Sequence, residues 1–406
     1  APPSLGLSRP QSARLKLGGP GPVHAFPVET STSRRKAPQY WQDNFAKVAK
    51  KLGFRTSILN PCVCWSEEDE LYMLVHGDDI MLIGYDSALK TCKKNFEKEL
   101  LIKIPPFMGT AKGDAKEGKF LGRTIRVNSA GWELEASSKH AESLIEDFSS
   151  QGKLKSAVTP GSKSCELGTE NPDTKLNAED HSSYRRLVGI AQYLAGDRPD
   201  ICYAVKELTR DLQAPTYRSA AAVKRLARYL AGAPRLIQKY GWQYTDDGDI
   251  TGTADADHAG CQRTRKSTSG GLCTIGKHVI HFWCKTQTTE ALSSCESEFY
   301  SLVKCASESL YLKNLFEELG DVRTLSLFTD SSAAKGIAFR QGVGKKMKHL
   351  TVQDLWLQAL IKSKKCSLHK IWGHVNPADL ATKHVDQGTI NRLLELWSCV
   401  IIKDNA

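Results

Sequence analysis

The chain has 406 residues, of which 40% are hydrophobic and 25% charged, which is enough for two or three mostly globular domains. Its 56 lysines and arginines outnumber its 45 aspartates and glutamates, and the net charge of +11 favours a polyanionic partner, either nucleic acid or an anionic membrane surface. No apolar run reaches about 18 residues, which excludes a membrane-spanning helix.

The twelve cysteines are scattered and form no C-x-x-C pair. We therefore expect reduced thiols in an intracellular protein, and no zinc site. No signal peptide opens the sequence, and its first residue is Ala1 rather than Met. These features predict a fragment, a processed product or a decayed reading frame.

The front of the chain begins with a segment of low apolar content. Residues 1–35 are rich in Pro, Gly, Ser and Arg, and this composition predicts disorder. Residues 36–54 place apolar side chains at spacings of four, three and four, which predicts an amphipathic helix. Apolar runs at 71–76 and 79–84 then predict two strands around a pair of adjacent acids.

The middle of the chain becomes helical and basic. A helix at 86–101, a strand at 119–127 and a helix at 138–150 precede a polar, turn-rich linker at 151–180. Three helices follow between prolines, and the third carries basic residues without matching acids. Such a helix face is either solvated or in contact with a nucleic-acid backbone. The three helices cover residues 181–195, 200–213 and 218–232.

After residue 246, strands alternate with helices, and acids stand at the ends of these elements. Acids that end neighbouring strands project from the carboxyl edge of a sheet, where open α/β sheets place their sites. Four carboxylates converge stably only around a cation, and hard oxygen ligands indicate Mg²⁺. Two such ions about 4 Å apart would support phosphodiester hydrolysis. The acids are Asp255, Glu298, Asp330 and Asp379.

Each of these acids has an alternative interpretation. Asp255 could be a turn residue with Asp257 the better-placed acid, and Glu296 competes with Glu298. A single aspartate at the position of Asp379 is most often a helix N-cap. Taken one at a time these alternatives are the commoner outcome, whereas the ordered set of four acids favours the metal site.

Several spaced motifs resemble one known family. TADADHAG, RKSTSGG, ALSSCESEFYSL, LSLFTDSSAA, KKMKHL and NPADLATK are similar to the ribonuclease H domain of copia-type retrotransposon Pol polyproteins. The upstream block YRRLVGIAQYLAGDRPDICYAVKELTR resembles the connecting region of these polyproteins. The resemblance implies an α+β / α/β architecture with a partial reverse transcriptase palm, a helical connection and an RNase H-like mixed sheet with helices on both faces. The implied division is 1–35 disordered, 36–150 palm, 151–180 linker, 181–245 connection, 246–396 RNase H-like domain and 397–406 tail.

The resemblance also implies a function. Its four acids would bind two Mg²⁺ ions, with Mn²⁺ as a substitute, and hydrolyse the RNA strand of an RNA–DNA hybrid. The order D, E, D, D favours this over integrase-type sites, which use D, D, E, and E-F-Y-S favours Glu298 over Glu296. The implied partners are the hybrid, other nucleic acid and the rest of the polyprotein, with no membrane. The implied location is intracellular, in cytoplasmic virus-like particles and in the nucleus.

Two alternatives to this enzyme stay open. One is an inactive remnant of a retroelement that binds nucleic acid, and the other is a structural part of a larger polyprotein. Further residues are expected as nucleic-acid contacts, and His374 follows from the resemblance as a proton shuttle or product-release residue, for which a structural histidine is the commoner alternative. The basic pattern of the third helix indicates Arg225 and Arg228. The resemblance implies Arg265, Lys266, Lys348, His349 and, in a strand resembling the primer grip, Phe120, Leu121 and Gly122.

The stretch LVHGDDIMLIG resembles the catalytic hairpin of the reverse transcriptases, and implies that Asp78 and Asp79 bind metal. A polymerase needs one more acid from an earlier strand. Glu29 is the one acid within residues 1–35, and it lacks the apolar strand expected around that acid. His76 also replaces the usual aromatic residue. We therefore expect no DNA synthesis by this chain alone.

Overall fold

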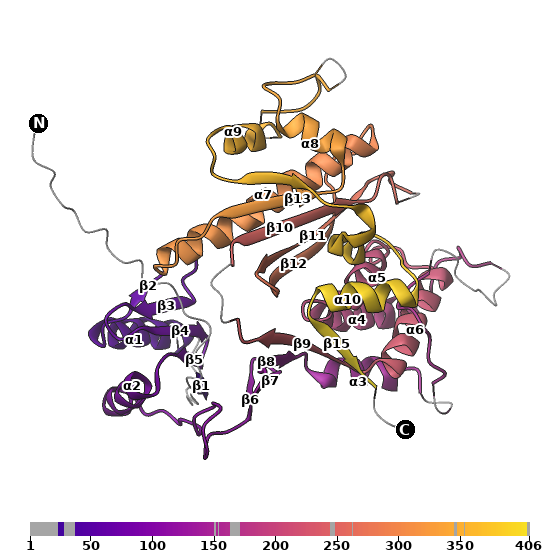
Figure 1. Cartoon of the computed structure of the whole chain (residues 1–406). Coiled ribbons are helices and arrows are strands. Elements are labelled where there is room, and N and C mark those ends of the chain that lie inside the picture. The colour runs from indigo at the N-terminus through magenta and orange to yellow at the C-terminus, as the bar shows by residue number, and fades with distance from the viewer. Residues whose placement is uncertain are drawn as a thin grey trace, which may run out of the picture.

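The computed structural model has a mixed α and β architecture with three five-stranded sheets among its described residues (Figure 1). This confirms the fold class expected from the sequence. The structure describes residues 23–27, 37–149, 152, 154–162, 171–243, 248–261, 263–344, 347–352 and 354–403.

The first sheet has the strand order β1-β5-β4-β3-β2, with all neighbours antiparallel. Phe45 and Phe96, from the two helices beside it, stack with their ring centroids 5.9 Å apart in the core. The structure differs from the predicted disorder at residues 23–27, which pair with β5, while the rest of 1–35 lies outside the described residues. The elements are β1 (Val23–Pro27), α1 (Ala37–Lys51), β2 (Arg55–Thr56), β3 (Val63–Ser66), β4 (Leu71–His76), β5 (Asp79–Ile83) and α2 (Asp86–Glu99).

The second sheet, of order β15-β9-β8-β7-β6, collects strands from distant parts of the sequence. Its strand β15 lies within the expected tail and pairs antiparallel with β9. Neither β9 nor β15 is predicted from the sequence, because their pairing is decided by contacts far along the chain. The strands are β6 (Glu117–Phe120), β7 (Arg123–Asn128), β8 (Gly131–Glu135), β9 (Arg235–Gly241) and β15 (Cys399–Ile402).

The stretch 119–127 is a hairpin rather than the single strand predicted. Strand β6 ends at Phe120 and β7 begins at Arg123, while Leu121 and Gly122 adopt φ values of 50° and 77°. Two consecutive residues with positive φ form the tight turn that suits the twist of a two-residue hairpin. Alternation of apolar residues continues through such a turn, so periodicity alone could not reveal it.

Four helices that lie between β8 and β9 in the sequence pack together, and a buried ion pair joins two of them. Arg198 is 1% exposed and donates two hydrogen bonds to Asp200, of 2.9 and 2.7 Å, at the start of α5. It also donates to the carbonyls of Ala233 and Pro234, after α6, and Tyr229 donates to Asp200 at 2.9 Å. The helices are α3 (Ser138–Glu146), α4 (Ala178–Ala195), α5 (Pro199–Thr209) and α6 (Tyr217–Gly232).

The third sheet has the order β12-β11-β10-β13-β14, in which β13 and β14 run parallel to β10 and the other pairs are antiparallel. A Cβ on Gly252 would meet the helix α7, whereas a Cβ on Gly270 would meet the short helix η2, so helices cover both faces. This agrees with the expected mixed sheet. The elements are β10 (Ile250–Ala256), β11 (Thr268–Ile275), β12 (His278–Thr286), α7 (Ser294–Glu318), β13 (Leu325–Thr329), β14 (Ser367–Lys370) and η2 (Pro377–Ala381).

Helix α7 extends beyond this sheet toward the front of the chain, as Figure 1 shows. Near its end, Glu318 accepts hydrogen bonds from the Ser57 hydroxyl at 2.6 Å and the Ile58 backbone at 2.7 Å. The helix therefore connects the third sheet with the loop between β2 and β3.

The last part of the chain has shorter elements than the sequence predicts. Of the alternating strands and helices expected after residue 246, the helix α9 begins at Trp356, and the stretch after Asn376 is a single 3₁₀ segment. No helix of the described residues is long and apolar enough to cross a membrane. The elements are α8 (Ser332–Ala338), α9 (Trp356–Lys362), η1 (Gly373–Val375) and α10 (Gln387–Leu396).

Candidate active site

Three aspartates meet at one edge of the third sheet. Asp255 lies near the end of β10 and Asp330 directly follows β13, and these two strands are parallel neighbours, so both acids reach the same carboxyl edge. Asp379 joins them from η2. One carboxylate oxygen from each aspartate lies within 4.8 Å of the others. The sequence prediction that these acids converge therefore agrees with the geometry.

Two buried hydrogen bonds hold the neighbouring elements against β10. Asn376, which is fully buried, donates to the Ala254 carbonyl at 3.2 Å and accepts from the Ala378 backbone at 3.0 Å. Asn376 is thus the N-cap of η2, so Asp379 does not fill the N-cap role that was its alternative. The Ser301 hydroxyl of α7 donates to the Asp255 carbonyl at 2.6 Å. Both contacts fix the elements that carry the acids.

Glu298 belongs to the same cluster. Its Oε2 is buried and has no hydrogen-bond partner among the described residues. Burial, followed by the negative charges of Asp255 and Asp330, raises the pKa of Glu298 to about 9. A carboxyl group responds in this way when it is forced beside other acids with little solvent. We define the acid cluster as Asp255, Glu298, Asp330 and Asp379.

Glu296 and Asp257, the two competing acids, are engaged elsewhere. Glu296 is 1% exposed and accepts from the Tyr300 hydroxyl at 2.9 Å, while His349 Nε2 lies 3.0 Å from its carboxylate. Asp257 accepts from the backbone and, at 2.9 Å, from the hydroxyl of Thr268. The geometric group thus contains Asp255 and not Asp257, and Glu298 rather than Glu296 lies within reach of the charges of Asp255 and Asp330.

The chemistry of the acid cluster fits a hard divalent cation. Asp255 is 2% exposed, and its pKa is raised to about 7, mainly by burial, with the Lys383 ammonium acting in the opposite direction. Four carboxylates offer only oxygen ligands, which suit Mg²⁺ or Mn²⁺. The unpartnered Oε2 of Glu298 is a further group that a cation would satisfy.

Two residues of the site are missed by the sequence reasoning. The Thr382 hydroxyl donates a hydrogen bond to Asp255, and Lys383 Nζ lies 2.7 Å from Asp379 Oδ1 and 3.6 Å from Asp255 Oδ2. Burial alone would lower the pKa of Lys383, but the carboxylates of Asp255 and Asp379 outweigh it and raise that pKa. The spacing of four residues between Asp379 and Lys383 in ADLATK is the signal that could have found the pair.

The predicted substrate contacts around the cluster are partly exposed. Lys348 is exposed, while His349 is paired with Glu296 as described above. His374 is an exposed residue of η1 and follows Gly373, at which a Cβ would stand 3.2 Å from Asp330 Oδ2. The backbone before His374 therefore passes directly beside the cluster.

The predicted basic contacts differ in their environment. Arg265 is exposed and Lys266 half-buried, both in the loop between β10 and β11. Arg225 instead donates to the Thr159 hydroxyl at 2.8 Å, and Arg228 donates to the Lys155 carbonyl at 2.8 Å. The two α6 arginines thus hold the segment 154–160 against the helix, a use that the helix pattern could not reveal.

Asp78 and Asp79 lie at the hairpin turn between β4 and β5, where His76 pairs with Asp79. Asp78 is exposed and Asp79 half-buried. Within the described ranges, no third Asp, Glu, His or Cys groups closely with them. Glu29 lies outside the described residues. The predicted primer-grip residues Phe120, Leu121 and Gly122 form the end of β6 and its hairpin turn.

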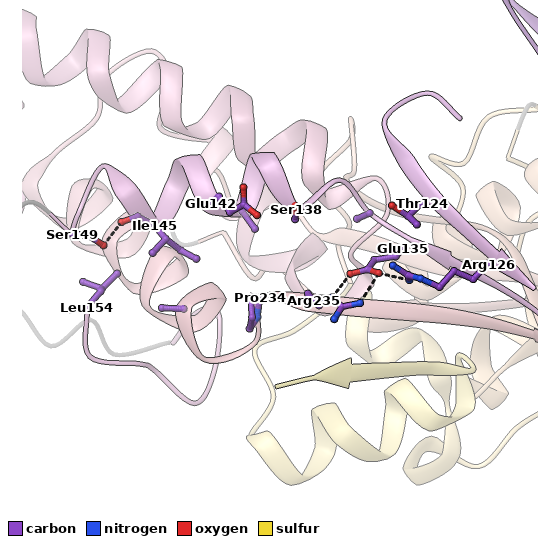
Figure 2. Close-up of a pocket in the computed structure, with 13 residues that line it drawn as sticks. Thr124, Arg126, Glu135, Ser138, Glu142, Ile145, Ser149, Leu154, Pro234 and Arg235 are labelled. Atoms are coloured by element: carbon purple, nitrogen blue, oxygen red, sulfur yellow. Dashed lines mark hydrogen bonds and ion pairs between the residues drawn. The ribbon is translucent and has the colours of Figure 1, made fainter. Parts of the chain in front are cut away.

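A separate cavity of about 540 Å³ lies between β7, β8, α3 and the end of α6 (Figure 2). Its most buried charge is Glu135, which is 5% exposed and accepts hydrogen bonds from both Arg126 and Arg235. Burial opposes ionisation of Glu135, but the two guanidinium groups outweigh it and lower its pKa. The three charges neutralise one another to a single positive charge, and none of the acid-cluster residues lines this cavity.

Comparisons with known proteins connect the chain to transposons. No protein-family model matches it. The retrovirus-related Pol polyprotein from transposon TNT 1-94 of Nicotiana tabacum is 27% identical over 372 residues, which cover 89% of this chain and 27% of that protein. The secreted RxLR effector protein 161 of Plasmopara viticola is 36% identical over 132 residues, which cover 32% of this chain and 90% of that protein. The chain spans about a quarter of the transposon polyproteins that it matches.

One solved structure that is similar is the foamy viral protease-reverse transcriptase dRH in complex with double-stranded DNA. It is 12% identical with a TM-score of 0.24, and the match covers 86% of this chain and 52% of that chain. Because this TM-score is low, the fold class rests on the strand orders given above.

Proposed function

Because the chain belongs to the retrovirus-related Pol polyproteins of copia-type transposons, we propose that it hydrolyses the RNA strand of RNA–DNA hybrids at the acid cluster, with Mg²⁺ or Mn²⁺ as cofactor. The observation that carries this proposal is the meeting of Asp255, Asp330 and Asp379 at one sheet edge, with the half-buried Glu298 beside them. Their order along the chain, D, E, D, D, supports hydrolysis by an RNase H-type site.

The four carboxylates of the cluster would hold the metal. When bound, Mg²⁺ supplies positive charge for a phosphodiester oxygen and lowers the pKa of a water molecule. Asp255 is the most deeply buried of the three aspartates, and Thr382 fixes one of its oxygens by a hydrogen bond. Asp330 and Asp379 are half-buried and face the more open side, where a nucleic-acid backbone would approach.

The residues around the cluster would orient the substrate. Exposed Arg265 and Lys348 are suited to phosphate contacts, and the excess positive charge of the chain would attract a hybrid duplex. Preference for an RNA strand requires contacts to its 2′-hydroxyl groups. We assign no DNA synthesis to Asp78 and Asp79 in this chain alone, a prediction that rests on Glu29 lacking the apolar strand expected around a third acid. Templated incorporation in a primer-extension assay would contradict that assignment.

The direct test is cleavage of a labelled RNA–DNA hybrid by the purified chain in Mg²⁺. We expect Asp330→Asn to abolish cleavage while leaving the melting temperature close to that of the wild type. Asp249→Asn is the matched control, because Asp249 is exposed just before β10, at the end of that strand away from the cluster. Unchanged cleavage by Asp330→Asn would refute the site.

One result would instead favour the alternative function. If the wild type binds the hybrid with a steep salt dependence but does not cleave it, the protein is a nucleic-acid-binding remnant. Counterion release gives such binding its salt dependence without any chemistry at the acids.

A further inference from the structure

Lys383 is placed where a cation is needed in the acid cluster. Its ammonium reaches Asp379 Oδ1 at 2.7 Å and Asp255 Oδ2 at 3.6 Å, although 43% of its side chain is exposed. The stem therefore enters from the surface and the charge is directed inward. This inward direction distinguishes it from a surface lysine, which usually keeps its ammonium in water.

The charges around the cluster are strongly unbalanced without this lysine. Asp255, Asp330 and Asp379 bring carboxylate oxygens within 4.8 Å of one another, and the nearby charges of Asp255 and Glu298 act against each other. Among the described residues, Lys383 is the cation whose charge acts on both of them. Like charges at such short separations are costly unless a cation compensates them.

We propose that Lys383 holds the position of a divalent ion between Asp255 and Asp379, so that an ion must displace its ammonium in order to bind there. This inference rests on the proposed function, because it assumes that the acid cluster binds metal. Lys383 is then a positioning residue that keeps the metal-free cluster folded and lowers its affinity for metal.

The geometry explains why the ammonium and an ion compete. The oxygen of Asp379 that the ammonium contacts at 2.7 Å is also one of the oxygens that a metal would use. A dication beside that oxygen would repel the ammonium, since both carry positive charge within a few ångströms. The Thr382 hydroxyl donates a hydrogen bond to Asp255 Oδ2, the same oxygen that lies 3.6 Å from Lys383 Nζ. Thr382 therefore fixes the position of that oxygen.

The test is a calorimetric titration of the purified full chain with Mn²⁺ in the absence of nucleic acid. We expect Lys383→Gln to lower the Kd for Mn²⁺ about tenfold, the change that loss of a competing ion pair of about 1.4 kcal/mol would produce. The same variant should melt at a lower temperature than the wild type in EDTA, and gain more from added Mn²⁺. Lys383→Met, which keeps the aliphatic stem, serves if the glutamine variant fails to fold.

Two controls separate this role from a general effect of charge. Lys383→Arg retains the cation and should keep the Kd near that of the wild type. Lys313→Gln removes a half-buried lysine of α7 that is also paired with an acid four residues away, Glu317, and it should also leave the Kd unchanged.

The outcomes distinguish this inference from the proposed function. An unchanged Kd in a folded Lys383→Gln protein would overturn the inference alone, even if Asp330→Asn still abolishes cleavage. Failure of both the wild type and Lys383→Gln to bind Mn²⁺ would overturn the metal site of the proposed function, and this inference with it.

Discussion

Replacement of Arg198 by methionine tests the buried ion pair at the start of α5. The guanidinium is 1% exposed and donates to both Asp200 oxygens and to the carbonyls of Ala233 and Pro234. Methionine fills much of the volume but leaves the Asp200 carboxylate, 4% exposed, with the Tyr229 hydroxyl as its remaining side-chain donor. Breaking a buried pair from one side costs about 3–5 kcal/mol, because a desolvated charge is left behind.

That loss is large compared with the stability of a typical domain, about 5–15 kcal/mol. At about 2–4 °C for each kcal/mol, we expect the melting temperature of Arg198→Met to fall by about 6–20 °C. Circular dichroism and urea denaturation would measure both quantities. The double variant Arg198→Met with Asp200→Leu should recover much of the loss, since replacing both partners by apolar groups removes the unpaired charge.

A specific pattern would refute this reasoning. If Arg198→Met costs less than about 1 kcal/mol, the pair contributes no more than an exposed salt bridge. If the double variant is as unstable as the single variant, the cost comes from lost packing or from the two carbonyls rather than from Asp200.

Three further predictions concern other parts of the molecule. Glu298→Gln should reduce hybrid cleavage by on the order of a hundredfold or more, whereas exposed Glu290→Gln should not, as single-turnover rates would show. The two arginine partners of Glu135 lower its pKa in the folded state. Its charged carboxylate therefore stabilises the protein at pH values above its ordinary pKa of 4.5, and this stabilisation is lost as the pH falls below 4.5. The destabilisation caused by Glu135→Gln in urea should therefore be largest at neutral pH and shrink below 4.5; a constant difference would contradict the role of the charge. In hybrid-binding titrations, Arg265→Gln should reduce the salt slope by about 1, and Arg225→Gln should leave it unchanged because Thr159 already binds that guanidinium.

Sequence patterns predict the elements that local forces decide. The strands around the acid pair at residues 78–79 and the helix near 37–51 follow from apolar spacing, and they form close to where the spacing places them. Strands β9 and β15 are decided by a pairing that joins residues 235–241 with 399–402, and no local pattern shows such a partner.

The candidate site could be predicted to a similar extent. The positions of the four acids at element ends are visible in the sequence, and their meeting follows from the parallel pairing of β10 with β13. Glu296 is excluded from the acid cluster because its carboxylate is bound by Tyr300 and His349, and only tertiary packing fixes these two partners. Lys383 was missed because a lysine in a short polar stretch is usually a solvated residue, and only the fold turns its ammonium inward.

Helix α7 sets a fixed distance between the acid cluster and the loop between β2 and β3. Glu298 lies near its first turn in the acid cluster, and Glu318, at its last residue, binds the loop between β2 and β3. Their separation of twenty positions corresponds to about 30 Å of α-helix. Measured along a duplex, that length is about nine base pairs at 3.4 Å each. A duplex that touched both places would therefore meet the acid cluster at a set number of base pairs from the front sheet, whatever its sequence.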